Sequence, residues 1–156
     1  MRLALYQPEI PQNTGTLLRL GACLNIGIDI IEPCGFVFSD QRLQRSGMDY
    51  IQECNYERHS SWIDFYQNQK ARLILLTPAA QVSYYEFPFH PDDTLLLGRE
   101  SDGVPQEVAI LCPYHLQIPM VPQRRSINIS LAASMVLGEA LRQTKGFPYA
   151  QSSPKT

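Results

Sequence analysis

Short apolar runs alternate with longer amphipathic segments along this chain. The runs cover residues 3–6, 28–31, 73–76, 95–97 and 116–121, and Pro119 interrupts the last one. Continuous apolar runs of this length are typical of strands that are buried on both faces, as in a parallel sheet. We therefore expect each run to form a strand of one parallel sheet.

The segments between these runs have the start and stop signals of helices. Four helices are predicted: one that follows Asn13 as N-cap and ends near Asn25, one from Ser61, one from near Pro105, and one over about 130–145. The last is the clearest, because Gly146 follows it and Gly is the usual residue just beyond a helix. Strands that alternate with helices predict an α/β fold with helices on both faces of the sheet.

The length and charge of the chain narrow its class. With 156 residues, the chain has the size of one compact domain, which we expect over 1–150, with a flexible tail over 151–156. A net charge of -2 excludes a protein whose whole surface is basic, so a polyanion such as a nucleic acid must bind at a local basic site. No apolar stretch approaches the ~20 residues of a membrane span, and the first residues are too short a run for a signal peptide, so we expect a cytoplasmic protein.

The cysteines and histidines are too scattered to predict a metal site. The cysteines are Cys23, Cys34, Cys54 and Cys112, and the histidines are His59, His90 and His115. No two cysteines have the spacing of a zinc or redox motif, and no pair of histidines has the spacing of a zinc-binding helix. Without an export signal, reduced and mostly buried thiols are favoured over two disulfides.

Ligands of parallel α/β sheets bind beyond the carboxyl ends of the strands, so the loops after the runs are the candidate sites. These loops are Thr77-Pro78, residues 98–103 and residues 122–130. Two glycine motifs that bind phosphates are absent. Gln7-Pro8, and not Gly-x-Gly-x-x-Gly, follows the first run, and Val104-Pro105 stands where a P-loop has Lys and Ser or Thr. Hydrolases of α/β type place the nucleophilic serine two residues after a glycine, in the motif Gly-x-Ser-x-Gly. Ser101 lies three residues after Gly98, which disfavours a hydrolase.

Two local positive sites stand out in this acidic chain. Arg19 follows Asn13-Thr14-Gly15, where free backbone N–H groups at a helix start and a guanidinium could hold one phosphate. Alternatively, Arg19 extends to solvent or pairs with a carboxylate. Arg124-Arg125 is the second site, and its alternative is a solvated surface turn. Arg42 and Arg45 are further candidates for the same positive surface, or a solvated pair.

Three motifs together resemble the SpoU branch of the knotted SPOUT methyltransferases. They are Asn13-Thr14-Gly15 with Arg19, Leu97-Gly98-Arg99-Glu100 through Gly103, and Ile118-Pro119-Met120 with residues 125–130. The likeness covers nearly the whole chain and is greatest to the small YibK-type members, which methylate the ribose of the tRNA wobble nucleotide. It implies that the C-terminal part of the α/β sheet fold forms a deep trefoil knot, an exception to unknotted topology.

The resemblance also implies a site, a cofactor and partners. S-adenosylmethionine is the implied methyl donor, without a metal, and its implied binding residues are Thr77, Gly98, Glu100, Ile118, Met120 and Ser126. Asn13, Arg125 and Asn128 are the implied substrate-binding residues, and Arg19 is the implied catalytic residue. The implied substrate is the anticodon stem-loop of a tRNA, in leucine isoacceptors, and the implied assembly is a homodimer.

The chain departs from the YibK-type pattern at four positions. Arg99, Ser101 and Asp102 replace the usual Pro, Thr and Arg, and Gly138 stands where an aromatic residue is common. These departures weaken the assignment of the tRNA, and not the methyl-transfer class. A SPOUT enzyme that acts on another tRNA or rRNA position, and a non-catalytic RNA-binding protein with the same fold, remain the alternatives.

Overall fold

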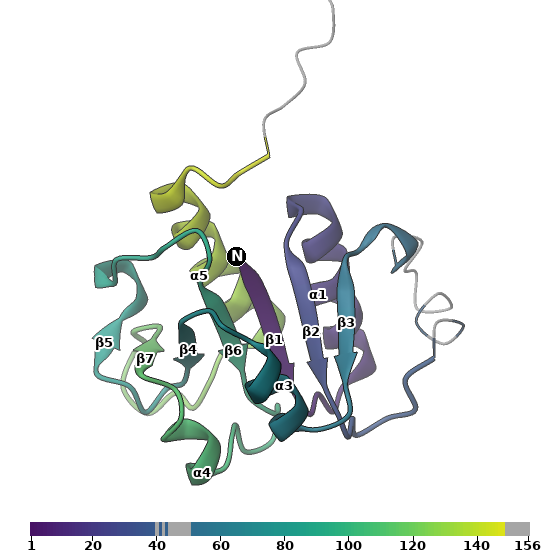
Figure 1. Cartoon of the computed structure of the whole chain (residues 1–156). Helices are drawn as coiled ribbons and strands as arrows, with labels where there is room; N and C mark the ends of the chain where they lie inside the picture. Colours follow the sequence, from purple (N-terminus) through teal and green to yellow (C-terminus); the bar gives the residue numbers. More distant parts are fainter. Residues whose placement is uncertain (40, 42, 44–50, 149–156) are drawn as a thin grey trace, which may run out of the picture.

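A parallel sheet forms the centre of the molecule (Figure 1). The structure is a computed structural model that describes residues 1–39, 41, 43 and 51–148. In this part of the chain the strand order is β3-β2-β1-β6-β4-β7-β5, and every pairing is parallel. The strands are β1 (Arg2–Tyr6), β2 (Gly27–Ile31), β3 (Tyr56–His59), β4 (Leu73–Leu76), β5 (Val82–Ser83), β6 (Thr94–Leu97) and β7 (Tyr114–Gln117). The expected parallel sheet is confirmed.

Helices cover both faces of this sheet, as the alternation of elements predicts. They are α1 (Pro11–Leu24), α3 (Trp62–Asn68), α4 (Gln106–Ala109) and α5 (Ile129–Thr144), with the short 3₁₀ helices η1 (Ile51–Glu53) and η2 (Tyr84–Glu86). Side chains of a strand alternate between its faces. Leu3 and Leu5 of β1 therefore belong to the core under α1 and α5, whereas Ala4 and Tyr6 belong to the core under α3 and α4.

The strand register brings the loops of the site together. Tyr6 at the end of β1 pairs with Ile31 of β2, and Leu97 of β6 pairs with Leu5 and Leu76 on its two sides. The carboxyl ends of β1, β2, β4 and β6 therefore lie at one edge of the sheet, where the arrows of β1 and β2 point in Figure 1. The loops after these strands begin side by side at that edge.

Two predicted boundaries are wrong. The first helix begins at Pro11 with Ile10 as N-cap, so Asn13 is inside the first turn; the fixed φ of a proline at the first helical position explains the earlier start. The strand expected over 116–121 is β7, which covers Tyr114–Gln117. Its pairing ends before Pro119, because a proline has no N–H to donate. The helix near Pro105 begins where the sequence predicts, with Pro105 as its N-cap, and is only four residues long.

Other boundaries are confirmed. Ser61 caps α3 and accepts a hydrogen bond from the Asp64 N–H, and α1 ends at Asn25 in the left-handed conformation. Helix α5 starts one residue before its predicted position, with Asn128 as N-cap. Strands β3 and β5 have no counterpart among the predicted elements. The trefoil knot that the resemblance implies stays a prediction.

Several predictions fall outside the described residues, and others are tested there. Arg42, Arg45, the domain end at 150 and the tail over 151–156 are not among the described residues. All four cysteines are free; two of them are buried, Cys34 is half-buried and Cys23 is exposed. Among the described helices, none combines the length and the apolar character that a membrane crossing requires.

Candidate functional site

A cavity of about 890 Å³ opens at the carboxyl edge of the sheet. Its lining comes from the loops after β4, β6 and β7, from α4 and from the starts of α1 and α5. The structure brings together here all the residues predicted for the cofactor and the three predicted for the substrate: Thr77, Gly98, Glu100, Ile118, Met120, Ser126, Asn13, Arg125 and Asn128. Arg19, the predicted catalytic residue, is not among the described lining residues. The roles of these residues stay predictions.

The loop 98–103 folds back on itself beside the cavity. The Arg99 N–H donates to the Gly103 carbonyl at 2.9 Å, and the Gly103 N–H donates to the Arg99 carbonyl at 3.1 Å. A Cβ atom on Gly98 would lie 2.6 Å from the Cα and carbonyl carbon of Gly103, a distance that real Cβ atoms essentially never show. Gly103 itself has a φ of 72°, which favours glycine. The turn therefore requires glycine at both ends.

Apolar and backbone groups form the rest of the cavity wall. The Thr77 N–H donates to the Leu116 carbonyl at 2.9 Å and so ties the end of β4 to β7. Ile118 is buried and Met120 is half-buried, and both line the cavity after β7. His115 also lines it, with its Nε2 atom 2.9 Å from the Ala109 carbonyl oxygen. This wall is suited to an organic ligand with an apolar part.

Three polar side chains of the lining are bonded to one another. The Asn13 Nδ2 group donates to Glu100 Oε1 at 3.3 Å, and the Asn128 Nδ2 group donates to Asn13 Oδ1 at 3.1 Å. Asn128 Oδ1 accepts the N–H of Ser130 at 2.9 Å, as the N-cap of α5. The three motifs of the sequence therefore meet in one chain of hydrogen bonds, in which Asn13 is the middle member.

Glu9 is a member of this polar cluster for which the sequence predicts no role. Its N–H donates to Glu100 Oε2 at 2.9 Å, and its carboxylate accepts from the Ser101 N–H at 2.9 Å and from Ser101 Oγ at 2.8 Å. Glu9 and Ser101 are 92 positions apart, so the sequence does not indicate this contact. The only available signal was the position of Glu9 in the loop after the first strand.

Arg99 and Asp102, two of the residues that differ from the YibK-type pattern, form an ion pair within the loop 98–103. Arg99 Nε lies 2.9 Å from Asp102 Oδ1, and Arg99 Nη1 donates to Gln7 Oε1 at 3.3 Å. The guanidinium carbon lies 5.7 Å from the centre of the Tyr6 ring. Burial raises the pKa of Tyr6, and the Arg99 charge opposes that rise. The positive charge at Arg99 is thus compensated locally by Asp102.

The arginines of the chain differ in their partners. Those paired with carboxylates are Arg2, Arg58, Arg72, Arg99 and Arg142. Arg124 and Arg125 are exposed, and neither forms an ion pair or a side-chain hydrogen bond with any residue that the structure describes. Arg19 is exposed on α1 and has an interaction of its own. Arg125 is thus the cavity-lining cation that remains available for an anion.

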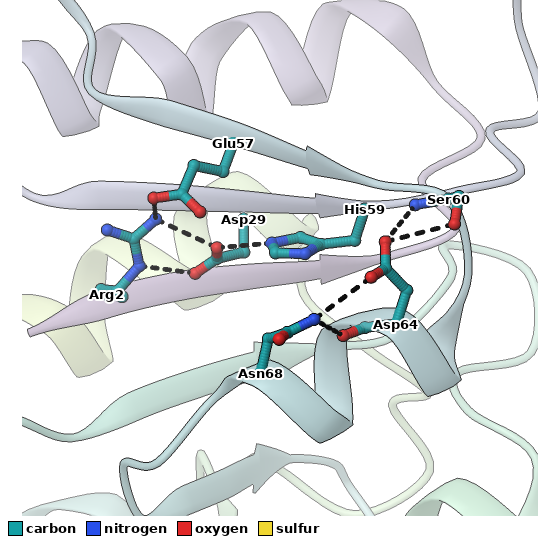
Figure 2. A network of polar contacts seen from close by, with 7 residues as sticks. All are labelled: Arg2, Asp29, Glu57, His59, Ser60, Asp64 and Asn68. Atoms are coloured by element: carbon teal, nitrogen blue, oxygen red, sulfur yellow. Dashed lines mark hydrogen bonds and ion pairs between the residues drawn. The ribbon is translucent and has the colours of Figure 1, made fainter.

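A second polar cluster lies on the α3 face of the sheet, away from the cavity (Figure 2). Asp29 of β2 is buried, and strand pairing brings Glu57 and His59 of β3 beside it. Ligand atoms of these three residues lie within 4.8 Å of one another. The sequence did not reveal this group, because its histidine and Glu57 are distant from Asp29 along the chain.

Arg2 pairs with two members of this second cluster, Asp29 and Glu57 (Figure 2). Its Nε and Nη2 atoms donate to Asp29 at 2.7 and 3.0 Å, and Nη2 lies 3.6 Å from Glu57 Oε1. The hydrogen bond to Asp29 is the main reason that the pKa of Arg2 is raised. His59 Nε2 lies 2.8 Å from Asp29 Oδ1. A cation would have to displace this guanidinium, so we assign the cluster to an ion-pair network that ties β1, β2 and β3.

Comparisons with known proteins agree with the geometry. A family model described as the SpoU rRNA Methylase family matches residues 1–138. A relative from Beijerinckia indica subsp. indica, named tRNA (cytidine(34)-2'-O)-methyltransferase, is 48% identical over 156 residues, which cover 98% of each chain.

Solved structures show the same fold. One, which describes structural insights into the 2-OH methylation of C/U34 on tRNA, matches with a TM-score of 0.86 and 38% identity over 93% of this chain and 96% of its own. Another is an AdoMet-bound rRNA methyltransferase from Sinorhizobium meliloti, with a TM-score of 0.79 and 25% identity over 90% of this chain and 55% of its own.

Proposed function

Because this chain belongs to the SpoU rRNA Methylase family, we propose that it transfers a methyl group from S-adenosylmethionine to the ribose 2′-hydroxyl of the tRNA wobble nucleotide, a cytidine or uridine derivative. The observation that carries this proposal is the cavity at the carboxyl edge of the sheet, where the predicted cofactor and substrate residues gather. Relatives and a solved structure named for the same reaction support it. Residues 1–150 are proposed to act as one methyltransferase domain, in the cytoplasm, where tRNA is found.

The cavity fits a cofactor of this kind. Its volume of about 890 Å³ lies within the range of about 300–1,000 Å³ for small-molecule sites. The tight fold over Gly98 leaves loop backbone rather than a side chain at the cavity wall, and Ile118 and Met120 offer apolar cover for an adenine. When bound, S-adenosylmethionine supplies a methyl group on a positively charged sulfur. That an AdoMet-bound structure shares this fold gives further support.

The protein side chains orient the substrate and stabilise charge. In the transfer, the ribose oxygen bonds the methyl carbon as the carbon–sulfur bond breaks, so oxygen, carbon and sulfur must be aligned. Arg125, at the cavity and without a described carboxylate partner, binds a phosphate of the substrate. Asn13 and Asn128 act mainly by holding one another and Glu100 in place. A guanidinium is a poor base at neutral pH, so Arg19 orients the hydroxyl and stabilises its developing charge, and a substrate phosphate assists in removing the proton.

We also propose a homodimer in which Arg19 serves the cavity of the partner subunit. Arg19 is exposed on α1, and α1 packs beside α5, on which Leu131 and Met135 are exposed. These apolar side chains lie one helical turn apart and are both exposed in the part of the chain that the structure describes. In each subunit Arg19 lies outside the described lining of the cavity. Association through this surface would bring Arg19 of one subunit to the cavity of the other.

Mapping the methylated nucleotide tests the function directly. RNA from a strain that lacks the gene, and the same RNA after incubation with purified protein and S-adenosylmethionine, are compared by nucleotide-resolution mapping of ribose methylation. A new 2′-O-methyl group at the wobble position of leucine tRNAs is expected. Modification of a base, or of rRNA, would contradict the proposed substrate. Calorimetry with S-adenosylmethionine alone tests the cofactor, since a non-catalytic RNA-binding protein has no need to bind it.

A further inference from the structure

The loops after β1, β2 and β6 converge on a single residue, Glu9, at the edge of the sheet. The Glu9 N–H donates to Glu100, and the Glu9 carboxylate receives both the N–H and the hydroxyl of Ser101. Glu9 and Glu100 therefore each contribute one carboxylate to a reciprocal link between the first loop and the loop 98–103. Hydrogen bonds to charged groups contribute more to stability than those between neutral groups, so this link is stronger than an ordinary turn contact.

The loop after β2 fixes Glu9 from the other side. The Gly35 N–H donates to the Pro8 carbonyl at 2.9 Å, and a Cβ atom on Gly35 would lie 3.0 Å from the Glu9 Cα. That distance is tighter than nine in ten real Cβ contacts, and the facing atom is backbone. The main chain at Glu9 is thus packed against residue 35 on one side and bonded to the cofactor loop on the other.

Glu9 does not belong to the cavity lining, although its partners Glu100 and Ser101 do. On the basis of the function proposed above, we propose that Glu9 is a positioning residue that holds the loop 98–103 in the conformation that binds S-adenosylmethionine. It acts through Ser101 and Glu100, and it does not touch the reacting atoms. Without the Glu9 carboxylate, the Ser101 N–H loses its acceptor, and among the described residues the Ser101 hydroxyl keeps Asp102 as its partner, with Oδ1 3.1 Å away.

Cofactor binding and steady-state kinetics of Glu9 variants test this role in the full-length protein. Glu9→Ala is expected to weaken S-adenosylmethionine binding, measured by calorimetry without tRNA, by about tenfold or more, because two charge-assisted bonds are lost. The KM for S-adenosylmethionine should rise by a similar factor while the KM for tRNA changes by less than about twofold. Glu9→Gln keeps one acceptor oxygen and should recover part of the affinity. Glu107→Gln, an exposed glutamate of α4 outside the cavity lining, is the matched control.

A double-mutant cycle separates positioning from general destabilisation. Ser101→Ala removes the hydroxyl, Ser101→Thr retains it, and only the first should weaken cofactor binding. In Glu9→Ala, the further change Ser101→Ala should have little added effect, because the bond is already lost. Gly35→Ala, which displaces Glu9 without removing its carboxylate, should raise the same KM to a smaller extent.

The outcomes distinguish this inference from the function on which it rests. Wild-type protein that binds no S-adenosylmethionine overturns both. Wild-type protein that binds it while folded Glu9→Ala binds equally well overturns the role of Glu9 alone. Additive effects of Glu9→Ala and Ser101→Ala, or equal rises in the two KM values, also overturn it, since they would indicate a general loss of structure.

Discussion

Asn13 and Asn128, which are 115 residues apart in the chain, share a hydrogen bond of 3.1 Å between their side-chain amides. Asn13 lies in the first turn of α1, and Asn128 is the N-cap of α5. The bond therefore joins the starts of two helices that both line the cavity, and Asn13 extends it to Glu100 at 3.3 Å. The geometry of the cavity depends on how well these amides are matched as donor and acceptor.

Substitutions at Asn128 can separate its capping role from its link to Asn13. Asn128→Ala removes both, and we expect the free energy of unfolding to fall by about 1 kcal/mol from the lost cap. Asn128→Asp keeps an acceptor for the Ser130 N–H but has no N–H to donate, so it places two acceptors opposite each other. We expect Asn128→Asp to retain most of the stability and to lose methyl transfer several-fold. Urea unfolding and a methylation assay measure the two effects, and wild-type activity in Asn128→Asp would show that the link to Asn13 is dispensable.

Two glycine-to-alanine changes should have opposite effects on stability. In Gly98→Ala the new Cβ would meet the Gly103 backbone at 2.6 Å, so the loop must shift, at a cost of about 1–3 kcal/mol, and cofactor binding should be lost. Gly138 lies inside α5, and a Cβ atom added there would meet nothing within 4 Å, so Gly138→Ala should stabilise the protein by up to about 1 kcal/mol. Thermal unfolding and calorimetry measure both. Equal melting temperatures for the two variants would contradict the close packing of the 98–103 loop.

The buried strands could be predicted from the sequence, and the edge strands could not. β1, β2, β4 and β6 are flanked by strands on both sides, and their side chains are almost all buried, which produces mostly apolar runs in which Asp29 of β2 is the buried charged exception. β3 has the sequence Tyr-Glu-Arg-His and lies at the edge, where charged side chains are tolerated, so its composition does not indicate a strand. β5 is too short for any pattern.

The candidate site shows the same division between local and distant information. The residues predicted for the cavity come from motifs that are recognisable within a few consecutive residues, and the resemblance to the SpoU family is confirmed by the family model. The contact between Glu9 and Ser101 depends on strand order, because β1 and β6 are neighbours in the sheet although they are far apart in the chain. No local pattern encodes that neighbourhood, so the link could be found only in the folded chain.

Arg124 and Arg125 should contribute to the salt dependence of RNA binding through contacts to phosphates. Each phosphate contact that is lost reduces the slope of log affinity against log salt by about 0.7–0.9, and we expect Arg125→Ala to do so by one such step. Arg142→Ala is the control, because Arg142 is paired with Glu139 on α5 at 2.9 Å. Filter binding of tRNA at several salt concentrations measures the slopes. The wild-type slope should be shallow, and a steep slope would indicate many phosphate contacts and contradict this layout.

The buried thiol of Cys112 should make the protein less stable at alkaline pH. Burial raises its pKa from 9.0 to about 11, and its Sγ donates to the Val108 carbonyl at 3.4 Å. The folded state therefore keeps a proton that the unfolded state loses above pH 9, so this contribution to stability is present below pH 9 and is lost as the pH rises toward 11.

Unfolding at two pH values measures the effect of Cys112. Between about pH 8 and 10 the wild type should lose about 1 kcal/mol of unfolding free energy that Cys112→Ala does not lose. The variant starts from a lower stability because of its cavity, but only the change with pH is compared. Cys23→Ala, at an exposed position, should follow the wild type. An identical pH dependence in Cys112→Ala would show that another group is responsible.

Mixed dimers test whether Arg19 completes the site of the partner subunit. Arg19 is exposed on α1 and is outside the described lining of its own cavity, whereas Met120 lies within that lining. Arg19→Ala alone should bind S-adenosylmethionine within about twofold of wild type and lose most methyl transfer. Met120→Trp should obstruct the part of the cavity beside residue 120 and abolish binding. Each variant is thus expected to be inactive by itself, for different reasons.

When the two variants are denatured and refolded together, about half of the dimers contain one subunit of each kind. In such a dimer the open cavity of the Arg19→Ala subunit faces the intact Arg19 of the Met120→Trp subunit, so one site of two is complete, and activity should return to about a quarter of wild type. Mixing after separate folding, without exchange of subunits, is the control and should give no recovery. If the refolded mixture also stays inactive while gel filtration shows dimers, Arg19 does not act across the interface, because every other part of one site is present in the mixed dimer.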